Sequence, residues 1–155
     1  MINAVDLDGL TALHFAADRS DEEVFSRLLD VASPTLINVA THDGWTALHH
    51  AARNGLKVVP RLLDVASPTL IAAATSRGDT ALHFAADRSG LAEEVIARLW
   101  RLNPESLYAA NKKRETPFDF AVQLENDYAI ELWQGSLPLD DIVNAFVFVE
   151  DTSYM

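Results

Sequence analysis

The stretch TALHFAADRS at residues 11–20 decides the fold, because it occurs again without change at residues 80–89. A close variant, TALHHAARNG, occupies residues 46–55, and a weaker one, TPFDFAVQLE, occupies residues 116–125. The threonines that open these segments are separated by 35, 34 and 36 residues. Self-similarity at a period of this size predicts a repeat architecture in which each unit packs on its neighbours.

Each period has the pattern of two short helices and a turn. In the first period, Leu13 and Ala16 follow helical spacing, and Thr11 is a suitable N-cap because its hydroxyl can accept a backbone N–H. Residues 22–32 form the predicted second helix, and Pro34 follows where a helix must stop. A single unit of this kind cannot bury its apolar face, so the pattern predicts stacking of successive units.

The second period differs from the first at Pro60, which stands where the first period has Ser26. Proline is tolerated only in the first turn of a helix, because it lacks an N–H and crowds the preceding turn. We therefore expect the second helix of this period to begin late, near Val58 or Val59.

The three TALHxAA segments, each preceded by a glycine-containing turn, resemble the TPLHxAA signature of the ankyrin repeat. The resemblance covers about residues 2–135 and implies an all-α repeat solenoid of helix-turn-helix units joined by β-turn fingers. We therefore predict one ankyrin-repeat domain over residues 1–135, followed by a separate segment over residues 136–155. The approximate repeat boundaries that we expect are 1–38, 39–72, 73–109 and 110–135.

Some features depart from the family pattern. The period exceeds the usual length of about 33 residues, and the additional residues in VASPTLIN predict a longer loop after the second helix. Such loops resemble those of ankyrin repeats in host-directed bacterial effectors. In the fourth copy, Arg114 replaces the finger glycine and Asp119 replaces the histidine. We expect this finger to be distorted.

The segment 136–155 has two interpretations. It is either a cap over the last repeat or the start of another domain, and LPLDDIVNAF resembles the opening of an F-box. The sequence predicts a helix from Pro138 and a short strand over residues 146–149. If the segment is a cap, we expect it to bury three apolar side chains against the preceding helix. These are Ile142, Val143 and Phe146, packed on Tyr128, Ile130 and Trp133.

Composition and charge exclude several classes of function. The formal net charge is −11, and residues 115–155 hold 9 acidic and no basic side chains. This opposes nucleic-acid binding, which needs a basic surface. The absence of cysteine excludes disulfides, and no apolar stretch is long enough to span a membrane. We expect a cytoplasmic monomer, or a protein of the host cytosol if it is a secreted effector.

No pattern typical of an enzyme is present. There is no cysteine, no G-x-S-x-G segment and no phosphate-binding glycine loop. His14, His49 and His83 occupy the family histidine position, and the resemblance implies that each ties the first helix to the neighbouring finger. Equivalent positions in packed repeats lie about 10 Å apart, too far for one metal ion. We therefore predict a non-catalytic protein without a metal or cofactor.

The resemblance implies a scaffold that binds a partner protein through its finger tips and the first helices. Two alternatives remain, an adaptor that recruits a ubiquitin ligase through the F-box-like tail and a targeting module of a larger effector enzyme. We expect Trp45 and Arg53 to contribute most to binding, with Trp45 at an exposed finger tip, or else folded onto Leu10 of the neighbouring finger. The full set of predicted contact residues is Leu7, Asp8, Leu10, Asp18, Arg19, His42, Asp43, Trp45, Arg53, Asn54, Ser76, Arg77, Asp79, Asp87, Arg88, Lys112, Lys113, Glu115 and Gln123.

Overall fold

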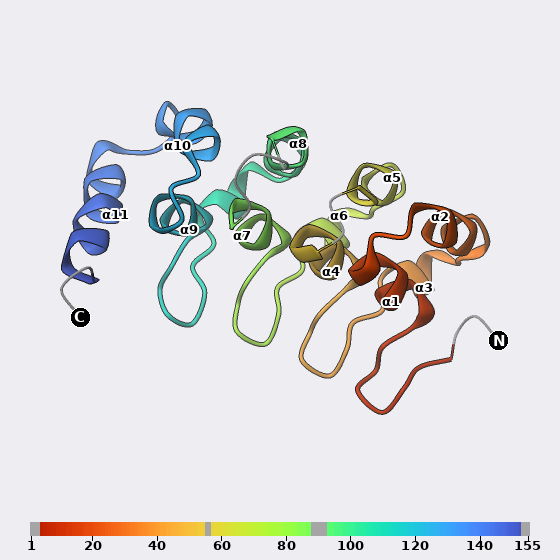
Figure 1. The fold of residues 1–155 in the computed structure, drawn as a ribbon. Helices are drawn as coiled ribbons and strands as arrows, with labels where there is room; N and C mark the ends of the chain where they lie inside the picture. Colours follow the sequence, from red (N-terminus) through yellow and green to blue (C-terminus); the bar gives the residue numbers. More distant parts are fainter. Residues whose placement is uncertain (1–3, 55–56, 88–92, 153–155) are drawn as a thin grey trace.

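The computed structural model describes residues 4–54, 57–87 and 93–152, and its secondary-structure elements are helices joined by loops (Figure 1). The elements are α1 Ala12–Arg19, α2 Glu22–Val31, α3 Pro34–Ile37, α4 Ala47–Asn54, α5 Val59–Leu63, α6 Pro68–Ile71, α7 Ala81–Ala86, α8 Glu93–Leu102, the 3-10 helix η1 Pro104–Tyr108, α9 Pro117–Gln123, α10 Asp127–Gln134 and α11 Leu139–Thr152.

The helices form two parallel rows. In the inner row, α1, α4, α7 and α9 contact one another in chain order, while α2, α5, α8 and α10 form the outer row (Figure 1). Ala16, Ala51, Ala85 and Ala121 stand at one equivalent position of the inner helices and are all buried. Their small side chains let neighbouring helices approach closely, as the alanine-rich pattern predicts. The stack is therefore a solenoid with one continuous core.

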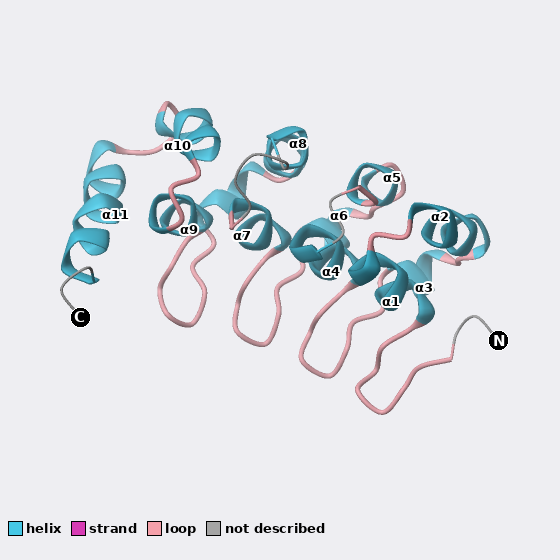
Figure 2. Cartoon of the chain, viewed as in Figure 1, coloured by secondary structure: helices cyan, strands magenta, loops and turns pink. Residues whose placement is uncertain are grey.

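A loop precedes each inner helix and projects to the same side of the stack (Figure 2). We call these loops the first to fourth fingers; they comprise residues 5–11, 40–46, 74–80 and 109–116. Gly78 has a positive φ of 85°. A Cβ there would lie 3.0 Å from the Asn111 Cα, so glycine is required where adjacent fingers meet.

The fourth finger keeps the turn of the other three, although among the described residues it lacks the isolated β-bridge that each of them forms, so the expected distortion is confined to its base. Arg114 takes the left-handed conformation that glycine has elsewhere, with a φ of 68°. The Asn111 N–H donates to the Glu115 carbonyl at 2.9 Å, which matches the bond from Thr75 to Asp79 in the third finger. The Asn111 side chain also accepts from the N–H groups of Lys113 and Glu115. The Thr75 hydroxyl accepts the equivalent two N–H groups in the third finger, so the two turns are held in the same way.

The SPTLI segments form short helices, which corrects the prediction of longer loops. Pro34 and Pro68 stand at the first position of α3 and α6, where a missing N–H costs nothing. Ser33 caps α3 by accepting the Leu36 N–H at 3.2 Å, and Ser67 caps α6 in the same way. Each short helix places a leucine in the core, so the additional residues of the period are structural.

Helix α5 begins at Val59, as Pro60 predicts. It covers five residues, whereas the corresponding α2 covers ten. Val59, Leu62 and Leu63 are nevertheless buried. The proline therefore shortens the outer helix without removing its contribution to the core.

The C-terminal segment is a continuous helix, α11, so the prediction of a strand over residues 146–149 is wrong. The helix packs against α9 and runs across the end of the stack (Figure 1). The expected burial is wrong for Val143 and Phe146, which are 49% and 42% exposed, whereas Ile142 is partly buried against the core. Ala145 is buried instead, and the Phe146 ring lies 6.4 Å from that of Phe118 in α9. Packing against α9 requires a helical stripe, which a strand does not supply.

Within the described ranges, no helix has both the length and the apolar character needed to cross a bilayer.

Candidate binding groove

In three of the four inner helices, the family histidine connects the helix to the following repeat unit. His14 Nδ1 accepts from the Thr11 N–H at 3.1 Å and lies 2.8 Å from the Thr11 hydroxyl. Its Nε2 lies 3.2 Å from the Trp45 carbonyl. Because a backbone N–H only donates and a carbonyl only accepts, the proton is assigned to Nε2. His14 thereby fixes the backbone of Trp45 on the next finger.

The same arrangement occurs at two further histidines. His49 forms hydrogen bonds with Thr46 and, at 3.1 Å, with the Ala73 carbonyl. His83 forms hydrogen bonds with Thr80 and, at 3.1 Å, with the Glu115 carbonyl. Burial is the main cause that lowers the pKa of His14 and of His49 to about 4, and it also lowers the pKa of His83. All three rings are therefore neutral near pH 7, with both ring nitrogens engaged in structural hydrogen bonds.

Asp119 replaces the histidine at α9. Its Oδ2 accepts from the Thr116 N–H at 2.7 Å and from the Thr116 hydroxyl at 2.8 Å. The carboxylate thus caps the helix as the imidazole does elsewhere.

The Trp45 ring is half-buried at the base of the second finger, so the prediction of an exposed tip is wrong. The Trp45 carbonyl accepts from the Thr41 N–H at 2.8 Å, which places Trp45 after the turn. Its ring lies 4.6 Å from Phe84 of α7 and 5.0 Å from His50, measured between centroids. The Arg53 guanidinium lies 5.4 Å from the ring centroid, as the sequence predicts for a flanking arginine.

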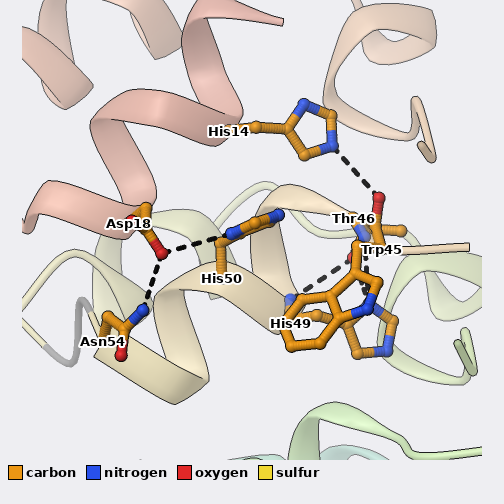
Figure 3. Close-up of polar contacts among 7 residues, drawn as sticks. All are labelled: His14, Asp18, Trp45, Thr46, His49, His50 and Asn54. Carbon is orange, nitrogen blue, oxygen red and sulfur yellow. Dashed lines mark hydrogen bonds and ion pairs between the residues drawn. The ribbon is translucent and has the colours of Figure 1, made fainter. Parts of the chain in front are cut away.

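A polar cluster joins α1 to α4 beside this tryptophan (Figure 3). Asp18 Oδ1 accepts from Asn54 Nδ2 at 2.6 Å and lies 3.3 Å from His50 Nδ1. Burial alone would raise the pKa of Asp18, but the hydrogen bonds from Asn54 and His50 lower it below its ordinary value. His50 Nε2 is buried and has no hydrogen-bond partner among the described residues. The cluster fixes the helix face on which Trp45 rests.

Two hollows lie between the fingers and the inner helices. The smaller, about 350 Å³, is next to the first and second fingers, and the larger, about 760 Å³, extends from the second to the fourth. Asp43, Trp45 and Arg53 line both hollows, so the two hollows are adjacent parts of one depression. We call this depression the finger groove.

Most predicted contact residues line the finger groove. They are Asp8, Leu10, Asp18, His42, Asp43, Trp45, Arg53, Ser76, Arg77, Asp79, Asp87, Lys112, Lys113 and Glu115. Others lie elsewhere: Leu7 is 95% exposed on the first finger, and Arg19 lines a separate pocket beside Phe15. Asn54 donates a hydrogen bond to Asp18, and Gln123 donates one to Glu115. Arg88 lies outside the described residues.

Asp79 is not the exposed contact residue that the sequence predicts. It is buried, and its Oδ1 accepts from Asn111 Nδ2 at 2.9 Å. Glu115 is half-buried and shares this amide, which lies 3.2 Å from its Oε2. Both carboxylates bond within the third and fourth fingers, because neighbouring fingers pack side by side.

Sequence analysis missed Phe84, Asn111 and Phe120, which also line the larger hollow. The position after the family histidine is occupied by Phe15, His50, Phe84 and Phe120. Three aromatic residues and a histidine at one repeat position were a signal that could have indicated this floor. Asn111 carried no such signal, because its role depends on contact with the adjacent finger.

Finger turns, paired helices and buried cap residues, repeated in register, define a helical-repeat solenoid. The family profile described as "Ankyrin repeats (3 copies)" matches residues 1–72. Over 55 residues the chain is also 40% identical to human transient receptor potential cation channel subfamily A member 1. That match covers 36% of this chain and 5% of the channel protein. The chain therefore contains ankyrin repeats over residues 1–72.

Proposed function

We propose that this chain is a non-catalytic scaffold that binds a partner protein in the finger groove. Ankyrin repeats are in general protein-interaction modules. The observation that carries the proposal is the half-buried Trp45, which lines both hollows with Arg53 over its ring. Tryptophan and arginine are the residues most enriched among the energetic centres of protein interfaces.

The environment of Trp45 supports this role. Its contacts with Phe84 and His50 hold the ring in place, so little side-chain entropy is lost when a partner covers it. The surrounding fingers are joined by backbone hydrogen bonds, such as the one from the Ser76 N–H to the Asp43 carbonyl at 2.8 Å. A rigid concave surface with a central aromatic side chain is suited to binding a protein segment.

The proposal is tested by affinity capture from the native lysate with quantitative mass spectrometry. Trp45→Ala should weaken capture of the partner by about 2 kcal/mol, or roughly 30-fold in affinity. The matched control is Phe15→Ala, which removes an aromatic ring outside the groove, where Phe15 lines a different pocket. Circular dichroism at the capture temperature confirms that both variants are folded. Equal capture by the wild type and Trp45→Ala would exclude the groove as the binding site.

A further inference from the structure

The charge of the finger edge changes sign along the stack. The first finger carries Asp6 and Asp8, and the second carries Asp43. The third carries exposed Arg77, and the fourth carries three exposed cations in succession, which are Lys112, Lys113 and Arg114. These cations are concentrated on two adjacent fingers of a chain whose net charge is −11.

The cations of the third and fourth fingers are available to a ligand. Among the described residues, ion pairs form at arginines of the outer row, such as Arg61 and Arg98. A further pair forms at His50. None of them includes Arg77, Lys112 or Lys113. The two carboxylates on these fingers, Asp79 and Glu115, bond Asn111 instead.

The positions of these cations are fixed by the fold. The Lys112 N–H donates to the Arg77 carbonyl at 2.8 Å, so the third and fourth fingers are held together at their tips. Below them, the floor of the larger hollow is aromatic. Phe84 packs on Trp45, and the Phe120 ring lies 5.3 Å from His83. The exposed cations Arg77, Lys112 and Lys113 therefore form a cationic rim beside the half-buried aromatic floor, in a hollow that Asp43 and Asp87 also line.

We propose that the partner segment in this groove is acidic and carries an apolar anchor side chain. Its carboxylates bind Arg77, Lys112 and Lys113, and its apolar side chain packs on Trp45 and Phe84. The acidic first finger repels such a segment, which places its negative end over the third and fourth fingers. This inference rests on the proposed function and adds the chemistry of the partner to it.

A protein segment fits these charges better than a nucleic acid does. A nucleic-acid strand would carry its negative charge along the whole groove, past Asp8 and Asp43. The nine acidic residues after Arg114, with no basic ones, add further repulsion. An acidic peptide needs to meet the cations only at one end.

The probe is a phage-displayed library of random dodecapeptides, selected on the full chain. Selected peptides are then measured by fluorescence polarisation against variants. Lys112→Glu/Lys113→Glu reverses the cationic rim. The matched control Lys57→Glu/Arg101→Glu makes the same change of net charge at two exposed residues outside the groove. Trp45→Ala tests the groove itself, and a single-stranded RNA dodecamer is the competing probe.

We expect selected peptides to be rich in aspartate and glutamate and to contain an aromatic or branched aliphatic side chain. Their affinity should fall about tenfold or more with Lys112→Glu/Lys113→Glu and less than about threefold with the control. Neutral or basic peptides that require Trp45 would overturn the acidic-partner inference while leaving the proposed function intact. Peptides indifferent to Trp45→Ala, or no selected peptides at all, would count against both. Tighter binding of the RNA that requires Lys112 and Lys113 would replace a protein ligand by a nucleic acid.

Discussion

Residues 11–18 and 80–87 have the same sequence but different surroundings. In both segments a threonine and a histidine cap the inner helix, and the histidine bonds the next finger. Phe15, however, is 50% exposed, whereas Phe84 packs on the rings of Trp45 and His49. The short sequence determines the cap, and the preceding unit determines whether the phenylalanine is covered.

The two ends of the described stack differ in the same way. At the start, Phe15, Val24 and Leu28 line a mostly apolar pocket on the face of α1 and α2. At the other end, α11 lies against α9, and Phe118 is 2% exposed. A repeat unit presents an apolar face on each side, and its stability depends on what covers that face.

The largest expected effect comes from uncovering α9. Deleting residues 136–155 should lower the free energy of unfolding by about 3 kcal/mol or more, because Phe118 and its apolar neighbours become exposed. Ala145→Asp should reproduce part of this loss, since Ala145 is buried. Val147→Asp, at a 57% exposed position of the same helix, is the control. Urea denaturation measures all three, and unchanged stability after the deletion would show that the segment is not a cap.

The comparison of the two phenylalanines can be tested directly. Phe84→Ala should lower the free energy of unfolding by about 2–3 kcal/mol, because it removes the contacts with Trp45 and His49. Phe15→Ala should cost less than about 1 kcal/mol, since half of that side chain is already exposed. Thermal and urea denaturation of the pair give both values. Equal losses would contradict the conclusion that the preceding unit causes the difference.

The histidines should behave alike in the two copies. His14→Ala and His83→Ala should each cost about 1–3 kcal/mol, because each leaves buried backbone groups without partners. We expect the same for His49→Ala, and almost no loss for His42→Ala, since His42 is exposed. Denaturation with urea measures the series. A much smaller loss at His14 than at His83 would mean that the cap itself depends on a preceding neighbour.

The smallest expected effect is a pH dependence. Burial lowers the pKa of His49 from 6.5 to about 4, so the unfolded chain binds more protons than the folded chain between these values. Stability is therefore lost as the pH falls through this window, by about 1 kcal/mol for His49 between about pH 7.5 and pH 5.5. His14 acts in the same direction. The difference in the free energy of unfolding between wild type and His49→Gln should therefore become smaller at the lower pH. A difference that does not change with pH would contradict this assignment.

The sequence predicted most of the residues that line the finger groove, but not how their side chains are packed. Arg77, Lys112 and Lys113 were expected at the finger tips, because their distance from the repeat threonine fixes their place in the turn. The exposure expected for Trp45 and Asp79 was wrong, since burial at the base of a finger depends on the adjacent units. The strand expected at residues 146–149 was wrong for a related reason, because α11 is stabilised as a helix by packing on α9.

The sequence by itself determined the repeat, the threonine and histidine caps, the glycine turns and the late start of α5. These features depend on interactions within a few residues, or on a period that brings equal segments into equal positions. Only the tertiary structure decided that Phe84 covers Trp45, that Asp79 bonds Asn111 and that α11 packs against α9 at the end of the stack. Those outcomes depend on which surfaces meet between units, and contact between distant segments forms only when the units are stacked.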